Sequence, residues 1–257
     1  MSLSVLILAK NEEQRIADCI KSASFADEII VIDDYSTDNT VTIATELGAR
    51  VVQRGLDGNW GEQQTFAILQ ATTDWIFFLD ADERINLPLR EEIEKAVALN
   101  ERVAYRTPRL NHLMGYPLRH GGWYPDYVPR LFPRDSVRFE GLVHPAPVYS
   151  LALKTCKSPI IHYTYSSWEQ YFNKLNVYTK LAAEKNALKG KQVNFLGDIV
   201  LRPMFAFIKL YILRAGWRDG KAGFILAVFH YFYTMAKYVK LYYIQNPGSS
   251  ERENRNI

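Results

Sequence analysis

Cysteine is scarce in this chain of 257 residues, which contains only Cys19 and Cys156. Two distant cysteines in no metal-ligand spacing argue against a disulfide framework and against a zinc site. Such low cysteine usage fits a reducing cytoplasm. The short apolar run at residues 1–9 is followed at once by charged residues, so it predicts a first strand rather than a secretory signal.

Long apolar runs and glycine-rich phosphate loops are also missing. The longest stretch without Lys, Arg, Asp or Glu covers residues 222–236, 15 residues, whereas a membrane-spanning helix needs about 20. No Gly-x-Gly-x-x-Gly follows the first predicted strand, and no Gly-x-x-x-x-Gly-Lys-Ser/Thr occurs anywhere. These absences disfavour a dinucleotide-binding dehydrogenase and a P-loop NTPase.

The composition is that of a folded protein with an uneven distribution of charge. The chain is 48% hydrophobic and 23% charged, which indicates one large domain, or one domain with an appendage. Residues 1–97 contain 18 acidic and 8 basic residues, which is a net charge of −10. Because the whole chain has a net charge of +3, the remaining residues carry a net charge of +13. We therefore expect a basic surface in the second half that meets an anionic partner, such as phosphates, lipid head groups or nucleic acid.

The first hundred residues alternate between strand and helix patterns. Strands are predicted at 3–8, 28–32, 50–53 and 75–79, and the helices between them include 39–47 and 62–70. This spacing predicts right-handed βαβ units and a mostly parallel sheet with helices on both faces. Residues 75–79 are continuously apolar, as in a central strand that is buried on both sides.

Polar residues follow these predicted strands, at the sheet edge where α/β proteins bind ligands. They are Asn11 and Glu12 after the first strand, Asp33 and Asp34 after the second, and Asp80 and Asp82 after the fourth. Side chains at i and i+2 leave one face of a strand. Asp80 and Asp82 can therefore converge on Mg²⁺ or Mn²⁺, or one can bind the metal and the other a sugar hydroxyl. The alternatives are a solvated acidic turn at Asp80–Asp82 and helix capping by Asp33 and Asp34.

Three of these segments together resemble family 2 glycosyltransferases with the GT-A fold. They are Ala9-Lys10-Asn11-Glu12-Glu13, Asp33-Asp34-Tyr35-Ser36-Thr37-Asp38 and Leu79-Asp80-Ala81-Asp82-Glu83. The resemblance continues through Gly122-Trp123-Tyr124-Pro125-Asp126, Arg130-Leu131-Phe132 and Val143-His144, over about the first 165 residues. Within the family, the nearest likeness is to bacterial sugar transferases of the lipopolysaccharide inner core, which act on a heptose.

The resemblance implies a role for each matching position. The nucleotide site would include Ala9, Asn11, Glu12, Asp33, Asp34, Gln64 and Asp80. Asp34 would bind the base or ribose, and Asp80 would contact ribose or metal. Asp82 would hold the metal at the diphosphate, with His144 as a further ligand unless it is a structural histidine. Many relatives have a basic residue and then Asn where this chain has Gln64-Thr65, which puts a charged contact to the base in doubt.

The segment from His112 to Asp126 is dense in Gly, Pro, Tyr and Trp, a composition typical of a rigid binding loop. Asp126 follows aromatic residues, and partial desolvation would raise the pKa of its carboxyl group toward that of a useful general base. The resemblance places the acceptor-side carboxylate near this position, so Asp126 is the predicted general base and Glu140 is the second candidate for that role. The alternative for Asp126 is a structural aspartate in a turn. Arg130 is expected to pair with the diphosphate as the leaving group gains charge.

The last third of the chain changes to aromatic and basic helical patterns. Helices are predicted at 168–189, 201–214 and 224–243, and seven basic but only two acidic residues lie between Asp198 and Gln245. Such helices can lie in an anionic membrane surface. They can alternatively pack on the catalytic domain or pair in a homodimer. Nucleic acid binding is disfavoured, because the aromatic residues are interleaved with aliphatic ones.

These observations predict a GT-A domain at 1–165, an amphipathic helical extension at 166–245 and a disordered tail at 246–257. The predicted function is inverting, metal-dependent transfer of a hexose from a nucleoside diphosphate sugar, a UDP-sugar, to a hydroxyl of a membrane-associated glycan or glycolipid such as lipopolysaccharide core. The enzyme would work in the cytoplasm, at the cytoplasmic face of the inner membrane. Alternatives are a polyprenyl-phosphate sugar synthase and a non-catalytic glycan- or lipid-binding module. A nucleotidyltransferase is disfavoured, because it would be expected to have a glycine-rich basic loop after the first strand, where this chain has Lys10-Asn11-Glu12-Glu13.

Overall fold

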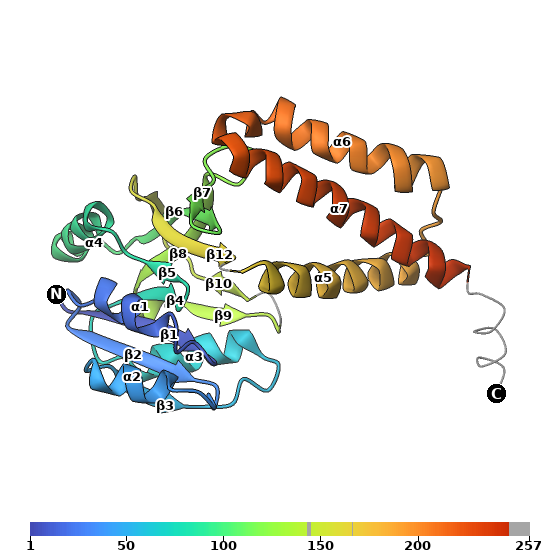
Figure 1. The fold of residues 1–257 in the computed structure, drawn as a ribbon. Helices are drawn as coiled ribbons and strands as arrows, with labels where there is room; N and C mark the ends of the chain where they lie inside the picture. The colour runs from blue at the N-terminus through green and yellow to red at the C-terminus, as the bar shows by residue number, and fades with distance from the viewer. Residues whose placement is uncertain (143–144, 166, 247–257) are drawn as a thin grey trace, which may run out of the picture. The chain divides into compact units, whose positions relative to one another are not determined.

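The structure, a computed structural model, describes residues 1–142, 145–165 and 167–246 (Figure 1). The chain forms two compact units, and each is described by itself. Unit 1 comprises residues 1–110 and 125–163, and unit 2 comprises residues 111–124 and 164–257. Residues 111–124 thus group with the C-terminal helices, whereas the sequence placed them in the catalytic domain. His144 and the tail at 247–257 lie outside the described residues.

The central sheet contains four parallel strands followed by antiparallel ones. The parallel strands, in spatial order, are β3 (Arg50–Gln53), β2 (Glu28–Asp33), β1 (Leu3–Ala9) and β4 (Trp75–Asp80). The sheet continues through β8 (Asp126–Pro133), β6 (Ala104–Leu113), β12 (Ile160–Tyr165) and β5 (Glu83–Arg84), with β7 (Tyr116–Pro117) and β11 (Leu153–Thr155) paired to β6. A separate ribbon contains β9 (Arg138–Glu140) and β10 (Ala146–Val148).

Helices α1 (Ile16–Ser22), α2 (Thr40–Glu46), α3 (Trp60–Gln70) and α4 (Leu87–Leu99) connect the strands of unit 1, and a short 3-10 turn, η1 (Arg134–Ser136), follows β8. The ends of α3 and α4 follow the capping rules. The side chains of Asn59 and Asn86 accept hydrogen bonds from the first-turn amides, and Asn100 ends α4 in the left-handed conformation.

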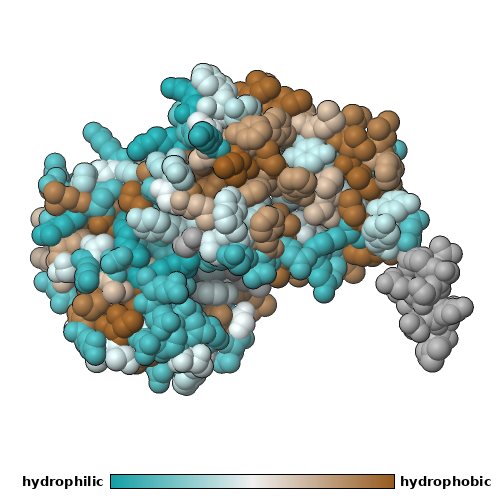
Figure 2. All heavy atoms as spheres, in the orientation of Figure 1, coloured by the Kyte–Doolittle hydropathy of each residue, from teal (hydrophilic) through white to brown (hydrophobic). Residues whose placement is uncertain are grey.

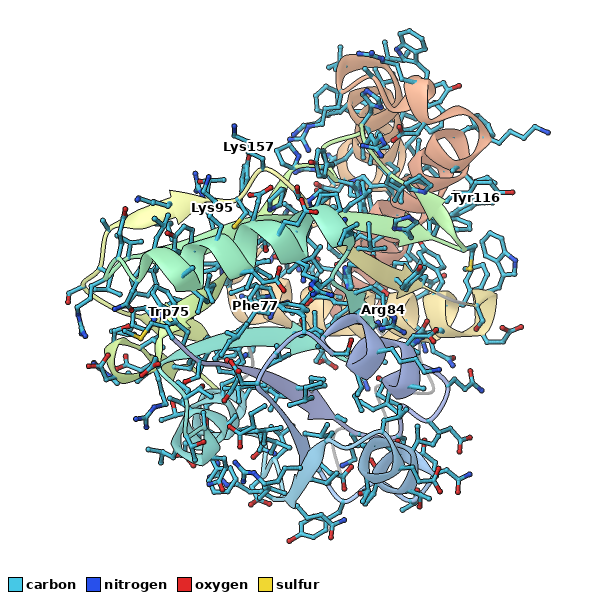
Figure 3. The ribbon with its side chains drawn as sticks, turned by 90° about the vertical axis from the view of Figure 1, so that its left-hand side faces the viewer. Trp75, Phe77, Arg84, Lys95, Tyr116 and Lys157 are labelled. Carbon is cyan, nitrogen blue, oxygen red and sulfur yellow. The ribbon has the colours of Figure 1, made fainter. Side chains whose placement is uncertain are left out.

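The core of unit 1 lies on both faces of β4, because successive side chains of a strand point to opposite sides. Trp75, Phe77 and Leu79 pack in one apolar cluster with residues of α1 and α4. Ile76 and Phe78 belong to a second cluster that includes residues of α3 and β9. Figure 3 shows Trp75 and Phe77 between β4 and α4. The prediction that this strand is buried on both faces is confirmed.

Unit 2 consists mainly of helices that pack along one another. They are α5 (Trp168–Leu188), the π-helical η2 (Phe195–Leu201), α6 (Arg202–Ile208), the π-helical η3 (Lys209–Leu213), the 3-10 turn η4 (Gly216–Asp219) and α7 (Gly220–Gln245). Helix α7 packs against α5 and α6 (Figure 1). A Cβ atom on Gly223 would lie 1.9 Å from the carbonyl oxygen of Gly216, so this close approach of α7 to η4 requires glycine.

Among the helices of the described part of the chain, none combines the length and apolarity needed to cross a membrane. The α/β architecture with a C-terminal helical extension agrees with the predicted fold class. The sequence patterns predict the parallel strands but not the antiparallel half of the sheet. Cys19 and Cys156 are both buried, and neither forms a disulfide.

Candidate active site

The strand register brings the predicted site residues to one edge of the sheet. Ala9 at the end of β1 lies opposite Asp33 of β2, and Leu8 lies opposite Asp80 of β4. The carboxyl ends of three neighbouring parallel strands therefore end at one level, where ligands bind in open α/β sheets.

A cavity of about 180 Å³, here called the strand-end pocket, lies at the ends of β1 and β2. Its lining residues are Leu8, Ala9, Lys10, Glu12, Ile32, Asp34, Leu56, Trp60 and Gln63. Three of them, Ala9, Glu12 and Asp34, were predicted to form the nucleotide site. An apolar lining with a few charged and polar groups suits a planar ring that carries hydrogen-bonding groups on its edge.

The charge of Asp34 is balanced inside this pocket. Its Oδ2 accepts a hydrogen bond from Lys10 Nζ at 2.7 Å, and its Oδ1 accepts one from the Leu56 amide at 2.9 Å. Burial acts to raise the pKa of Asp34, but the hydrogen bonds from Lys10 and Leu56 lower it overall. Lys10 keeps 60% of its side-chain surface exposed, so its ammonium group can also meet an anionic ligand. Sequence reasoning quoted Lys10 in the motif but gave it no role.

Gln63, rather than its neighbour Gln64, lines the pocket. Gln63 is 3% exposed, and its Nε2 donates to the carbonyl oxygen of Arg54 at 2.8 Å. Its Oε1 is buried and has no hydrogen-bond partner among the residues that the structure describes. A buried acceptor without a partner is costly, so a ligand that donates a hydrogen bond here would satisfy it.

Asn11 and Asp33 connect the loops that frame the pocket. The side chain of Asn11 accepts from the Thr37 amide at 2.8 Å, and its own amide donates to Ser36 Oγ at 2.8 Å. Asp33 is fully buried, and its Oδ2 accepts from the Ser36 amide and from Gln53 Nε2. Neither residue lines the pocket.

A second cluster of charges lies beyond the end of β4. Arg130 Nη2 donates to Asp80 Oδ2 at 2.6 Å and to both carboxylate oxygens of Glu83 at 2.7 and 2.8 Å. Glu83 is fully buried, and its Oε2 also accepts from the Asp80 amide at 3.1 Å. Burial acts to lower the pKa of Arg130, but the two carboxylates raise it, so its guanidinium stays charged. The sequence identified Asp80 and Arg130 but not their shared partner Glu83.

Asp82 lies in the same segment and is less exposed than Asp80. Its carboxylate has 23% of its side-chain surface exposed and lies 3.4 Å from Nε2 of His162. The Tyr163 amide donates to the backbone oxygen of Asp82, which fixes the segment against β12. His162, 13% exposed at its side chain, therefore borders the carboxylate that was predicted to bind metal. The other predicted ligand, His144, lies outside the residues described.

Asp126 and Arg109 lie opposite each other across β8 and β6. Asp126 Oδ2 accepts from Arg109 Nε at 2.9 Å and from Nη2 at 2.6 Å, and 40% of the Asp126 side chain is exposed. Arg109 Nη1 also lies 3.7 Å from Glu83 Oε1. A continuous chain of charges thus connects Asp126 with Asp80.

This chain of charges bears on the choice of the base. The Arg109 guanidinium donates two hydrogen bonds to the Asp126 carboxylate and so fixes its orientation. Glu140, the second choice, is 60% exposed at the side chain and pairs with Arg138 on its own short strand.

Fold and site together define an α/β protein whose ligand site lies at the carboxyl ends of parallel strands. The model of the family described as "Glycosyl transferase family 2" matches residues 4–137. The chain therefore belongs to glycosyl transferase family 2 and is a glycosyltransferase, which confirms the family and, with the strand order, the GT-A fold that the sequence motifs predicted.

Relatives match nearly the whole chain. A lipopolysaccharide core biosynthesis glycosyltransferase, LpsC, of Rhizobium meliloti is 29% identical over 94% of this chain and 92% of its own length. An uncharacterized glycosyltransferase of Rickettsia typhi is 30% identical over 93% of this chain and 86% of its own.

Solved structures are more distant. Staphylococcus aureus TarS 1–349 has a TM-score of 0.47 and 13% identity over 99% of this chain and 92% of that one. Glucosyl-3-phosphoglycerate synthase from Mycobacterium tuberculosis, in complex with Mn²⁺, uridine diphosphate and phosphoglyceric acid, has a TM-score of 0.40 and 24% identity over 52% of this chain and 56% of that one.

Proposed function

We propose that this protein is an inverting, metal-dependent glycosyltransferase. It moves a hexose from a nucleoside diphosphate sugar, a UDP-sugar, to a hydroxyl of a membrane-associated glycan or glycolipid such as lipopolysaccharide core. The observation that carries this proposal is the strand-end pocket, which shares one sheet edge with the carboxylates of Asp80 and Asp82.

The strand-end pocket is proposed to hold the nucleoside. Its buried acceptor, Gln63 Oε1, suits a ring N–H such as that of uracil, and cytosine has an acceptor at the same ring position. Asp34 and Glu12 are acceptors for ribose hydroxyls, and Lys10 suits the negative charge of the phosphates. These assignments favour a uridine nucleotide over a cytidine nucleotide.

Asp80 and Asp82 are proposed to hold Mg²⁺ or Mn²⁺ at the diphosphate. Both side chains are partly exposed, at 43% and 23%, and can accept a cation. Within residues 1–142, 145–165 and 167–246, no group of three or more His, Cys, Asp and Glu side chains could hold a metal by itself. This incomplete set fits a cation that takes its remaining ligands from substrate phosphates and water. When bound, the cation would neutralise the charge that develops on the diphosphate.

The protein's own groups then perform a single displacement. The Asp126 carboxylate takes the proton of the acceptor hydroxyl, whose oxygen attacks the anomeric carbon of the donor. The bond from that carbon to the diphosphate oxygen breaks, and the nucleoside diphosphate leaves with the electron pair. Arg109 orients Asp126, and Arg130 orients Asp80. Attack opposite to the leaving group inverts the anomeric configuration.

A metal-dependent binding experiment tests the donor site. Titration calorimetry with nucleoside diphosphates and their sugars, with and without Mn²⁺, should give tightest binding for a uridine nucleotide in the presence of metal. Asp82→Ala should weaken that binding at least tenfold, because it removes a charged metal ligand. The control is Asp57→Ala, since Asp57 is an exposed loop carboxylate outside the strand-end pocket. If no sugar nucleotide binds the wild type, the proposal is wrong.

The role of Asp126 separates the proposed activity from its alternatives. Asp126→Asn should lower kcat for transfer to a hydroxyl by about 10²–10⁴-fold and leave donor binding unchanged. A polyprenyl-phosphate sugar synthase needs no such base, because its acceptor is already an anion, and would keep its rate. A non-catalytic binding module would show no transfer in either form. Asp135→Asn is the matched control, because Asp135 also pairs with an arginine but is exposed.

An anionic membrane surface is proposed as a partner of unit 2, at the cytoplasmic face of the inner membrane. Large apolar side chains are exposed along η2, α6 and η3: Phe195, Leu196, Leu201, Met204, Phe205, Ile208, Ile212 and Leu213. Figure 2 shows hydrophobic residues gathered over this part of unit 2. Arg202, Lys209 and Arg214 lie in the same segment and complement anionic head groups. The name of the Rhizobium meliloti relative supports a lipopolysaccharide acceptor.

Vesicle flotation tests this contact. The protein should bind vesicles that contain anionic lipid more tightly than neutral vesicles, and Phe205→Ser should weaken binding about tenfold. Leu69→Ser is the control, because Leu69 is 74% exposed on α3 of unit 1. If Phe205→Ser instead dissociates a dimer in light scattering and leaves flotation unchanged, the apolar face pairs two copies and the membrane proposal is wrong.

A further inference from the structure

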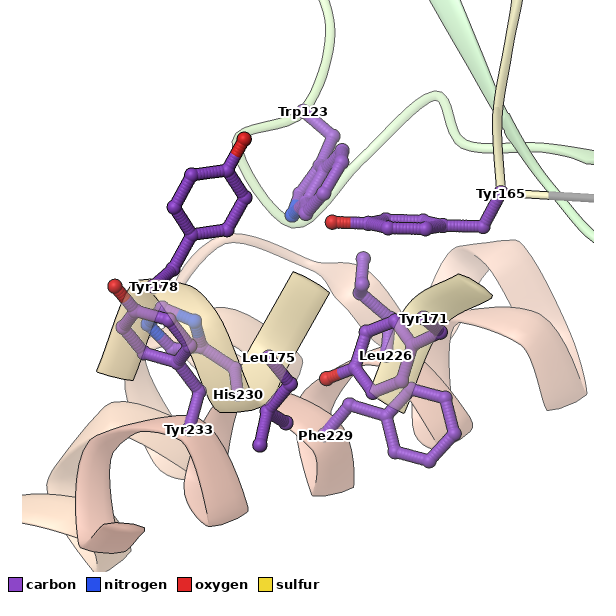
Figure 4. Close-up of a pocket in the computed structure, with 9 residues that line it drawn as sticks. All are labelled: Trp123, Tyr165, Tyr171, Leu175, Tyr178, Leu226, Phe229, His230 and Tyr233. Atoms are coloured by element: carbon purple, nitrogen blue, oxygen red, sulfur yellow. The ribbon is translucent and has the colours of Figure 1, made fainter. Parts of the chain in front are cut away.

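Unit 2 contains a pocket that the proposed donor site does not use. This cavity of about 200 Å³, here called the aromatic pocket, is formed by residues of unit 2 alone: Trp123, Tyr165, Tyr171, Leu175, Tyr178, Leu226, Phe229, His230 and Tyr233 (Figure 4). Trp123 and Tyr165 form one side, and side chains of α5 and α7 form the other. Its volume is below the roughly 300–1,000 Å³ of pockets for drug-sized ligands, so it suits one small ring.

The walls of the aromatic pocket are fixed by ring contacts. Tyr171 stacks on Phe229 with ring centroids 4.3 Å apart, and Tyr165 packs edge-to-face on Tyr171 at 5.1 Å. Trp168 supports Phe229 from outside at 5.3 Å. Tyr171 is 7% exposed, so the side chain that links α5 to α7 has little freedom. A rigid apolar wall binds a ligand with a small loss of entropy.

Hydroxyl groups give this apolar pocket a polar rim. Tyr165, Tyr171 and Tyr233 line this one pocket. Burial raises the pKa of all three phenols, so they remain protonated and each can donate and accept a hydrogen bond. Figure 4 shows the Tyr165 hydroxyl directed toward Trp123, and Tyr178 and His230 are exposed at the mouth.

This combination disfavours two classes of ligand. Among the residues that the structure describes, no Lys, Arg, Asp or Glu lines the aromatic pocket, and Lys174 lies with its Nζ 5.3 Å from the centroid of the Tyr165 ring. An isolated phosphate or carboxylate group would therefore meet no opposite charge among the lining side chains. An acyl chain would fill the cavity but leave the clustered tyrosine hydroxyls facing hydrocarbon, which is unfavourable. A pyranose matches both features, because its ring faces carry C–H groups and its rim carries hydroxyls. The C–H face loses its contact with water against the aromatic wall.

We propose that the aromatic pocket binds one sugar ring of the glycan acceptor, with the ring face against Trp123 and the sugar hydroxyls on the tyrosine hydroxyls. The proposal rests on the proposed function for the identity of the ligand as an acceptor. The pocket itself is independent of the donor site, since no residue is shared between the two linings.

The test uses the full chain and methyl glycosides of glucose, galactose, N-acetylglucosamine and a heptose in saturation-transfer NMR. At least one glycoside should bind, with the strongest transfer to the C–H protons of one ring face. Trp123→Ala should weaken that binding at least tenfold by removing a wall, and Tyr171→Phe or Tyr233→Phe about 2–10-fold by removing one hydrogen bond. Tyr231→Phe is the matched control on α7, because Tyr231 does not line the pocket, and it should bind as the wild type does.

The proposal is overturned if no glycoside binds. It is also overturned if a glycoside binds equally to the wild type and to all three pocket variants. Preferential binding of free nucleosides or of a short acyl glycerol would likewise contradict a sugar site. The phenylalanine variants keep the rings and the packing, so they test the pocket even if Trp123→Ala does not fold. Metal-dependent uridine nucleotide binding, measured on the same samples, should be unchanged in all variants. Its absence from the wild type would refute the donor site, not the sugar pocket.

Discussion

The two units of the molecule hold their candidate sites together by different interactions. In unit 1, the residues around the candidate active site are held by charge, with Glu83 and Arg130 buried beneath the more exposed Asp80. In unit 2, no Lys, Arg, Asp or Glu is among the described residues that line the aromatic pocket, which is held by ring packing. The charged site is the one proposed to bind a cation and a nucleotide, and the aromatic one is proposed to bind a neutral ring.

The difference also affects how each unit responds to mutation. A buried ion pair contributes little net stability while it is intact, but loss of one partner leaves an uncompensated charge. Apolar packing instead loses stability in proportion to the side-chain volume that is removed. Substitutions of similar size should therefore have different physical consequences in the two units.

The largest effect is expected at Glu83. Glu83→Gln keeps the shape of the side chain but leaves the buried Arg130 with only the half-exposed Asp80 as partner. We expect a loss of about 3–5 kcal/mol in the free energy of unfolding, measured by urea denaturation. Glu94→Gln is the control, because the exposed Arg90–Glu94 pair on α4 should contribute less than about 0.5 kcal/mol. Equal losses in the two variants would show that Glu83 carries no special electrostatic role.

A smaller loss is expected in unit 2 at Leu241. This side chain is fully buried among Ala183, Ile199 and Tyr238, in a cluster smaller than the cores of unit 1. Leu241→Ala should cost about 2–3 kcal/mol, the lower part of the range for leucine truncations. The effect should be the same at low and high salt, because no charge is involved. Leu188→Ala, at a position that is 91% exposed, should change stability by less than about 0.5 kcal/mol. Strong salt dependence in Leu241→Ala would contradict a purely apolar contact.

The parallel half of the fold could be predicted because its signals are local. Continuous apolar strands, spacing between strands and helices, and polar residues at strand ends all lie within short windows of sequence. Asp34 and Glu12 could be located in this way. The antiparallel half could not, because pairing of β8 with β4 and β6 depends on contacts between distant segments.

The same limit explains which site residues were missed. Glu83 follows Asp82 directly and looks like part of an acidic turn, and only the fold shows that Arg109 and Arg130 meet it in the interior. The two arginines on neighbouring strands were the available signal, since buried arginines require carboxylates. Gln64 was assigned from the family resemblance, and only the fold shows that Gln63 is the glutamine of α3 that lines the pocket. Helix α3 begins at Trp60, two residues before its predicted start.

The smallest effect on binding is expected at Gln63, and it tests how the strand-end pocket of unit 1 recognises an uncharged nucleotide base. Gln63→Ala removes the buried acceptor from the strand-end pocket. Loss of one hydrogen bond of about 1 kcal/mol should weaken uridine diphosphate binding about fivefold. Cytidine diphosphate, which offers no ring N–H there, should lose less, so the preference for uridine should narrow. Titration calorimetry with both nucleotides measures this preference. Gln70→Ala, at the end of the same helix, is the control. An unchanged preference would assign base recognition to another residue.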